Sequence, residues 1–364
     1  MKKGFNLDKI STKPNRLLTL LEEGHNRKTP MVLFGAGAWG SYYLSFIQKY
    51  WKDIIFCDND PIKWGTRIEN IPVISPEELM NTYYDCFITV TSLNYYKAII
   101  KQLTEMGLSD RIVMSMEGFI DNTFHSYYDT IRNNKELFSK IYDLLSDNLS
   151  KQILYDRLNC CITGDHQYLI PLVSSCPQYF EEDLIHLNEH EIFIDGGSYT
   201  GDTIEEFLRQ TGEKYEHIYA FEPETSKHEI FYQKFSGMKN IEVYPYGLWS
   251  KSEQLRFQAE NSGSSHLDQQ GNTVISVTSI DEVLQGKPVT FIKMDIEGAE
   301  FHALKGSAET IKKYKPKLAI CVYHQPLDIV RIPLYVKELV PEYKIYLRHY
   351  NINIYETVCY ATID

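Results

Sequence analysis

One stretch decides the fold, Glu191-Ile-Phe-Ile-Asp-Gly-Gly-Ser-Tyr-Thr-Gly-Asp202, because an apolar run leads directly into a glycine-rich turn. The apolar run is typical of a buried strand in a parallel sheet, and residues 203–209 favour a helix. Glycines in such a turn let backbone N–H groups and the start of the helix come close to a ligand. The order predicts a nucleotide-type site with six turn residues, which are Asp195, Gly196, Gly197, Ser198, Gly201 and Asp202.

Further strands are expected on the carboxyl-terminal side of this turn. Apolar runs at residues 217–221, 241–244, 289–294 and 317–322 predict parallel strands, each joined to the next through a helix. The last two runs, at 344–348 and 357–361, lie too close together for a crossover helix, so they should pair antiparallel. The sequence therefore predicts one doubly wound domain over residues 186–364.

A similar unit precedes it, in which the strand Met31-Val-Leu-Phe34 runs into three glycines with the spacing G-x-G-x-x-G. These are Gly35, Gly37 and Gly40, and Asp58 ends the following strand, which is the order of a dinucleotide-binding βαβ unit. Strands at 86–90 and 111–114 and a helix over 95–106 complete the expected sheet. Residues 1–120 are thus predicted to form a nucleotide or nucleotide-sugar binding domain, with a scaffold for packing or dimerisation as the alternative.

A helical segment is expected between the two sheets. Leu137, Ile141 and Leu144 recur at helical spacing, and Ile153, Leu154 and Leu158 continue the pattern. The fold class is therefore predicted as α/β, with two Rossmann-like doubly wound domains joined by a helical connector over residues 121–185.

The composition limits the functions that the chain can have. Its 37 basic and 49 acidic residues give a net charge of −12, which disfavours nonspecific binding of nucleic acid or anionic membranes. The seven cysteines contain no C-x-x-C pair, and no apolar run reaches the roughly 18 residues of a spanning helix. We expect a cytoplasmic protein with no membrane span and no nucleic-acid partner that acts on a small molecule or glycan; homo-oligomerisation is left open.

The acids around the glycine-rich turn indicate which ligand it would take. Asp195 and Asp202 are poorly placed for a pyrophosphate but suit an ammonium group, such as the one on the methionine moiety of S-adenosylmethionine. Glu222 ends the next strand, where an acid can bind both hydroxyls of a ribose. The cofactor expected from these residues is S-adenosylmethionine.

Several ordered motifs in this half resemble the FkbM family of S-adenosylmethionine-dependent methyltransferases. The resemblance rests on the Asp195 to Thr203 turn, Ala220-Phe-Glu-Pro223, Ile292-Lys-Met-Asp-Ile-Glu-Gly-Ala-Glu300 and Leu304-Lys-Gly306, and it covers about residues 186–364. It implies a class I methyltransferase sheet with an antiparallel last strand and methyl transfer to a hydroxyl oxygen. It also implies that Asp195, Gly197 and Gly201 form the cofactor turn and that Glu222 holds the ribose.

The stretch after the fourth predicted strand supplies the catalytic candidates. Strand alternation would place Lys293, Asp295 and Glu297 on one side, and Asp295 is the best group to position an acceptor. His324, in the loop after the fifth strand, is the natural base because an unperturbed imidazole titrates near pH 6.5. Glu297 and Glu300 can equally cap the next helix, while Arg348 and His349 are secondary substrate-binding candidates.

The same stretch also carries potential metal ligands. Asp295, Glu297, Glu300 and His324 offer ligands that suit magnesium or manganese, but no spacing among them dictates a site. We expect no obligatory metal.

The function predicted from these features is methylation of a hydroxyl on a sugar, a nucleotide sugar or a glycan precursor. The first domain is similar to the sugar-nucleotide-binding domain of some sialic-acid-type acyltransferases, on the residues Asp58-Asn-Asp-Pro61 and Ile71-Pro-Val-Ile-Ser75. Two alternatives stay open. One is an NAD-dependent oxidoreductase that uses Gly35 to Asp58, and the other is a nucleotide-binding sensor or scaffold without turnover.

Overall fold

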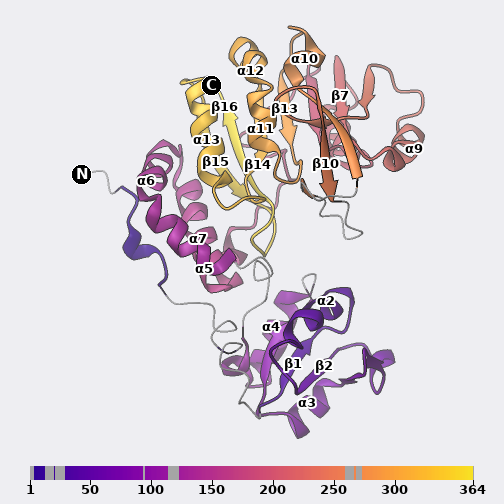
Figure 1. Cartoon of the computed structure of the whole chain (residues 1–364), viewed down its shortest axis with the longest axis vertical. Helices are drawn as coiled ribbons and strands as arrows, with labels where there is room; N and C mark the ends of the chain where they lie inside the picture. The colour runs from indigo at the N-terminus through magenta and orange to yellow at the C-terminus, as the bar shows by residue number, and fades with distance from the viewer. Residues whose placement is uncertain are drawn as a thin grey trace.

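The computed structural model of the chain describes residues 4–12, 20, 29–92, 95–113, 123–258, 266–267 and 273–363. These residues form a five-stranded, a four-stranded and a seven-stranded sheet. Figure 1 shows the five-stranded sheet at one end of the molecule, the seven-stranded sheet at the other and a group of helices beside the latter. The predicted α/β class with parallel-dominated sheets is confirmed.

The seven-stranded sheet has the order β15-β16-β14-β13-β6-β7-β8. Strand β16 is antiparallel to both of its neighbours, and every other neighbouring pair is parallel, so the predicted antiparallel ending is confirmed. The strands are β6 (Ile192–Gly196), β7 (His217–Phe221), β8 (Ile241–Tyr244), β13 (Phe291–Met294), β14 (Lys317–Cys321), β15 (Lys344–His349) and β16 (Thr357–Thr362).

Both faces of this sheet are buried, because successive strand residues such as Phe193 and Ile194 belong to different apolar clusters. Helices α8 (Asp202–Thr211) and α9 (Thr225–Lys234) cover the Phe193 face. The Ile194 face is covered by α10 (Ile280–Leu284), α11 (Glu300–Lys305), α12 (Ala308–Tyr314) and α13 (Asp328–Leu339). Burial on both faces explains why the strands are continuous apolar runs.

A small sheet with the order β11-β10-β12-β9 lies between β8 and α10, where the sequence predicted only a connecting helix. Its strands are β9 (Gly247–Leu248), β10 (Glu253–Gln258), β11 (His266–Leu267) and β12 (Thr273–Thr278). The expectation of a helix alone was wrong, because the polar and apolar residues of 253–258 alternate with the period of a half-exposed strand.

The connector is helical, with α5 (Thr123–Asn133), α6 (Lys135–Leu144), α7 (Asn148–Thr163) and the 3-10 turns η5 (His166–Tyr168) and η6 (Ile170–Leu172). The turn η1 (Leu7–Lys9) packs on these helices rather than on the first sheet (Figure 1). The Phe5 ring stacks on Tyr155 with centroids 5.1 Å apart, and the Tyr155 hydroxyl accepts the Asn6 N–H at 2.6 Å. We therefore propose that the amino-terminal residues 5–11 belong with the connector.

The five-stranded sheet has the order β3-β4-β2-β1-β5, and only the β3–β4 pair is antiparallel. Its elements are β1 (Met31–Phe34), α2 (Ala38–Ile47), β2 (Ile54–Cys57), η3 (Pro61–Lys63), β3 (Arg67–Ile68), β4 (Ile71–Ile74), α3 (Pro76–Thr82), β5 (Phe87–Val90) and α4 (Tyr96–Glu105). The predicted strand at 111–114 was wrong. Residues Ser109–Arg111 form the turn η4, Ile112 makes an isolated bridge to Ile88, and Met114 lies outside the described residues.

Within the described ranges, no helix combines the length and the apolar character that a membrane crossing requires.

Candidate active site

The glycine-rich turn between β6 and α8 packs directly against the loop after β13. Gly197 has φ +76°, and a Cβ atom there would lie 1.9 Å from the carbonyl oxygen of Asp295. Gly201 has φ +86°, and a Cβ atom there would lie 2.3 Å from the Phe235 ring. Both positions need glycine, because the backbone conformation and the close neighbours exclude a side chain. The turn and the Asp295 loop therefore form one continuous wall.

Glu222 follows β7 and holds the same turn from the other side. Its carboxylate accepts the backbone N–H of Tyr199 at 2.9 Å and that of Glu224 at 2.8 Å. The side chain is buried, and burial raises the pKa of Glu222. Each carboxylate oxygen has a second acceptor site, so the group can still accept hydrogen bonds from a diol.

Asp195 and Lys293 form a buried ion pair under the turn. Lys293 Nζ lies 2.9 Å from Asp195 Oδ1 and also donates to the carbonyl oxygens of Gly196 at 3.2 Å and Gly197 at 2.8 Å. Burial raises the pKa of Asp195 to about 6, although Lys293 opposes this shift. Because both side chains are buried, Asp195 is not accessible to the ammonium group of a ligand. The hydrogen bonds from Lys293 connect the turn to β13.

Asp295 accepts a hydrogen bond on each of its two carboxylate oxygens. The hydroxyl of Tyr179 donates to Oδ2 at 2.7 Å, and that of Tyr323 donates to Oδ1 at 3.1 Å. Burial alone would raise the pKa of Asp295, but Lys293 and His324 outweigh it and hold the pKa below its ordinary value. Asp295 is therefore an ionised, fixed hydrogen-bond acceptor.

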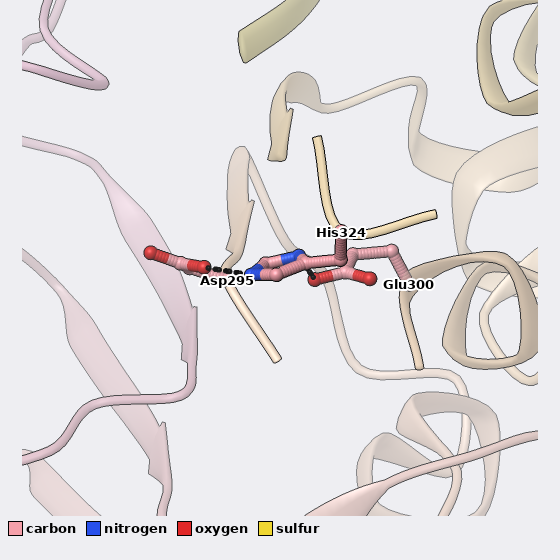
Figure 2. Close-up of side chains that lie close together, drawn as sticks. All are labelled: Asp295, Glu300 and His324. Atoms are coloured by element: carbon pink, nitrogen blue, oxygen red, sulfur yellow. Dashed lines mark ion pairs between the residues drawn. The ribbon is translucent and has the colours of Figure 1, made fainter. Parts of the chain in front are cut away.

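His324 is surrounded by acids (Figure 2). Nδ1 lies 2.9 Å from Glu300 Oε1, while Nε2 lies 3.4 Å from both Asp295 Oδ1 and Glu297 Oε2. Burial alone would lower the pKa of His324, but the carboxylates, Glu300 first, raise it to about 10. The ring therefore holds its proton at neutral pH, whereas the role of base expected for it requires a neutral ring.

Asp295, Glu300 and His324 each offer an atom that lies within 4.8 Å of the others, which makes them a candidate cation site. Figure 2 shows Asp295 at one ring nitrogen and Glu300 at the other, on opposite sides of the imidazole. Three ligands of one ion must instead converge on one point. The arrangement is that of a charge-paired imidazolium.

Glu297 and Glu300 reach His324 through a turn and not through strand alternation. Strand β13 ends at Met294, and Glu297 has φ +55° with Gly298 at φ +94°. Glu300 begins α11, and its Oε1 accepts the Ile296 N–H at 2.8 Å, as expected for an acid in the first turn of a helix. The turn brings Glu297 to the same ring nitrogen as Asp295.

Several residues that contact Asp295 or lie near it were not predicted from the sequence. Tyr179 lies in the connector after its last helical turn, and no pattern in the sequence marks it. Glu356 follows β15 and accepts a hydrogen bond from Gln178. Tyr323 adjoins His324 and could have been identified from its position at the end of a parallel strand, where ligands bind in open sheets.

Arg348 and His349 are engaged by other residues of the protein. Arg348 pairs with Asp147 at 2.8 Å and lies 3.8 Å from Glu181, so it ties β15 to the connector. His349 is fully buried and lies 2.9 Å from the Thr357 hydroxyl. The expectation that these two residues bind substrate was wrong, because connector helices cover this end of the sheet.

In the first sheet, the Asp58 side chain binds the backbone of the glycine turn itself. Its Oδ2 accepts the Ala36 N–H at 2.7 Å and lies 2.9 Å from Lys63 Nζ. Gly40 permits the helix to approach, because a Cβ atom there would lie 2.2 Å from the Gly35 carbonyl oxygen. No described atom lies within 4 Å of a Cβ built at Gly37. The turn is therefore open at Gly37, but Asp58 is already engaged by the protein.

Two family models match separate parts of the chain. The family model for the methyltransferase FkbM domain matches residues 195–351, and the model named C2185-like, N-terminal, matches residues 27–114. A comparison with curated proteins gives no match.

Among solved structures, a methyltransferase FkbM from Methylobacillus flagellatus KT is similar over 98% of this chain and 96% of its own, with 22% identity and a TM-score of 0.75. This likeness shows the fold. An rRNA methylase from Streptococcus thermophilus is 18% identical over 49% of this chain and 90% of its own, with a TM-score of 0.33. Fibrillarin from Aeropyrum pernix, in complex with S-adenosyl-L-methionine, is 12% identical over 50% and 71%, with a TM-score of 0.32. The last two likenesses carry no inference about this chain.

Proposed function

From the premise that residues 195–351 form a methyltransferase FkbM domain, we propose that the protein transfers a methyl group from S-adenosylmethionine to a hydroxyl oxygen. The acceptor is a sugar, a nucleotide sugar or a glycan precursor. One observation carries the proposal: the Gly197 turn touches Asp295 on one side and is held by Glu222 on the other. A nucleoside-binding acid and a catalytic carboxylate thus meet at the same turn.

The residues around the turn fit S-adenosylmethionine. Glu222 would accept hydrogen bonds from the two ribose hydroxyls, and Gly197 and Gly201 keep the turn narrow. Ser198 Oγ is buried and has no hydrogen-bond partner among the described residues, so it is left with a proton to donate. When bound, the cofactor supplies an electrophilic methyl group on a sulfonium. Asp202, the exposed first residue of α8, remains a candidate for the methionine end.

The catalytic roles follow from the contacts. Asp295, fixed by two tyrosine hydroxyls, would accept a hydrogen bond from the acceptor and orient it. His324 would balance the charge of the surrounding acids. Lys293 is a positioning residue, because its ammonium is fully used by Asp195 and the turn.

The residues around Asp295 and Tyr323 support a polyol as acceptor. Tyr355 is 39% exposed and meets Tyr323 edge to face, with ring centroids 6.0 Å apart. Gln178 and Glu356 add amide and carboxylate groups beside it. Aromatic faces together with such polar groups suit the apolar and hydroxyl faces of a sugar.

The cytoplasm is the proposed location, and the cysteines support it. All seven are free, and six of them are buried. Free buried thiols are typical of reducing compartments.

The rival hypothesis of an NAD-dependent oxidoreductase loses support at Asp58. The carboxylate that would bind the ribose accepts the N–H groups of Ala36 and Asp60 and also pairs with the Lys63 ammonium. Glu222 likewise accepts two backbone N–H groups, but it forms no ion pair with a described residue. The turn formed by Gly35, Gly37 and Gly40 is open at Gly37. We therefore retain the proposal that it binds a nucleotide or a nucleotide sugar, and that this site delivers the acceptor.

Calorimetric titration with S-adenosylhomocysteine and, separately, NADH tests the proposal. We expect S-adenosylhomocysteine to bind and its affinity to fall at least about tenfold in Glu222→Ala, the loss of one or two hydrogen bonds to a charged group. Glu229→Gln, an exposed change on α9 of the same domain, is the matched control and should bind normally. Binding of NADH that disappears only in Gly37→Ala would move the chemistry to the first domain. A protein that binds S-adenosylhomocysteine but transfers methyl groups to no acceptor would favour the sensor hypothesis.

A further inference from the structure

Three carboxylates contact His324, a fourth, that of Glu356, interacts with it electrostatically, and the four differ in what they bind. Asp295 accepts two tyrosine hydroxyls, Glu300 accepts the Ile296 N–H, and Glu356 accepts the Gln178 amide. Glu297 makes no hydrogen bond to any described residue, and its one contact is the 3.4 Å approach of Oε2 to His324 Nε2. Its carboxylate therefore keeps free lone pairs.

Exposure separates the same groups. Glu300 is fully buried, whereas the Glu297 side chain is 40% exposed. A group that takes a proton from a bound molecule must be accessible to that molecule and must have an unoccupied acceptor site. Among the acids that contact the ring, Glu297 meets these conditions best. It is the most exposed of them, and its carboxylate accepts no hydrogen bond from a described residue. Asp295 is 24% exposed and already accepts two tyrosine hydroxyls, and Glu300 is enclosed.

The backbone also points to function at this position. Glu297 has φ +55° immediately before Gly298 at φ +94°, in the turn that follows Asp295. A left-handed conformation is strained for a non-glycine residue. Such residues cluster at active sites, where the strain positions a side chain. Asp295 in turn touches the Gly197 turn, so Glu297 lies next to the proposed cofactor site.

We propose that Glu297 is the general base of the methyl transfer, with His324 as its protonated partner. The inference rests on the proposed function. The acceptor oxygen forms its bond to the methyl carbon as the carbon–sulfur bond breaks, and the sulfur keeps that electron pair. The hydroxyl proton passes to the Glu297 carboxylate and from there to water.

The acid strengths agree with this assignment. Burial raises the pKa of Glu297 to about 7, with Asp295 adding to the shift and His324 opposing it. A base works best when its pKa lies near the working pH. Asp295, whose pKa is lowered, is a weaker base, and His324 already carries its proton.

A binding experiment tests this inference without a known acceptor. Sinefungin carries an amine where S-adenosylmethionine carries its methyl sulfonium, so its ammonium probes whatever faces the methyl position. We expect the wild type to bind sinefungin about tenfold more tightly than S-adenosylhomocysteine, the order of one charge-assisted hydrogen bond. In Glu297→Gln this preference should fall to about twofold or less, while the affinity for S-adenosylhomocysteine stays unchanged.

The controls separate the two proposals. Glu297→Asp, which keeps the charge, should retain part of the preference, and Glu229→Gln should retain all of it. If S-adenosylhomocysteine does not bind the wild type, the proposed function fails. The second case is that S-adenosylhomocysteine binds equally to the wild type and to Glu297→Gln. If the preference for sinefungin is then absent from the wild type or unchanged in the variant, the proposed function stands and Glu297 is not the base.

Discussion

Lys293 Nζ lies 2.9 Å from Asp195 Oδ1, and the two side chains are 2% and 0% exposed. The pair joins the strand that leads to Asp295 to the strand that carries the glycine-rich turn. A buried charge that loses its partner is strongly unfavourable, so each residue requires the other.

Lys293→Met should destabilise the protein by about 3–5 kcal/mol, because the substitution leaves the Asp195 carboxylate buried without its partner. Guanidinium unfolding of the wild type and the variant measures the difference. The burial-raised pKa of Asp195, about 6, exceeds its unfolded value, so the carboxylate is neutralised as the pH falls. The deficit of the variant should therefore be larger at pH 8 than at pH 5.

The double variant Asp195→Asn/Lys293→Met is the control for this pair. It should recover a large part of the lost stability, because neither charge remains. Additive effects of the two single substitutions would contradict a coupled buried pair.

Gly197→Ala should disrupt cofactor binding more than its effect on stability explains. The new Cβ atom would lie 1.9 Å from the Asp295 carbonyl oxygen, so the turn or the Asp295 loop must move. Gly212→Ala is the matched control, since Gly212 also has a positive φ but no atom within 4 Å of the new Cβ. That control should lose only roughly 1–2 kcal/mol of stability and bind S-adenosylhomocysteine normally. Equal affinities for the two variants would argue against the contact between turn and loop.

Asp58→Asn should destabilise the first sheet by about 1–3 kcal/mol at neutral pH, the range for hydrogen bonds to a charged group. Burial opposes ionisation of Asp58, but the N–H groups of Asp60 and Ala36 and the Lys63 ammonium hold its pKa below the ordinary value. The stabilisation is therefore complete above about pH 4 and is lost as the pH falls through the lowered pKa. Chemical unfolding of the wild type and of Asp58→Asn between pH 3 and 8 measures this loss. The exposed Asp53→Asn is the control, and because it retains Asp58 it should keep the pH dependence of the wild type.

Arg348→Met should cost about 3–5 kcal/mol, because Arg348 is 7% exposed and bridges β15 to Asp147 of the connector. Lys315→Met removes one member of the exposed Lys315–Glu342 pair, whose side chains are 41% and 55% exposed, and provides the comparison. That exposed pair should contribute little to stability. Thermal unfolding distinguishes the two, and a small effect at Arg348 would mean that apolar contacts alone hold the connector.

Much of the architecture was predictable from local pattern. The apolar runs around residues 192–196 and 317–321 read as buried parallel strands, and the short spacing between the last two strands required an antiparallel pair. The small sheet at 247–278 was not predicted, because a long insertion between two parallel strands does not change the sequences of those strands. The prediction of a strand at 111–114 was wrong because a short apolar run carries no information about the strands that it could pair with.

The order of the elements and the types of residue at the strand ends could be predicted from the sequence alone. Glycine at 197, acid at 222 and acid at 295 are local requirements of the turn and of the ends of two strands. The protonation state and the partners of each group, in contrast, depend on the folded structure. Lys293 lies against Asp195, His324 lies among three carboxylates, and Tyr179 arrives from the connector to hold Asp295. Ionisation depends on burial and on charges brought together from distant positions, and spacing along one chain does not contain that information.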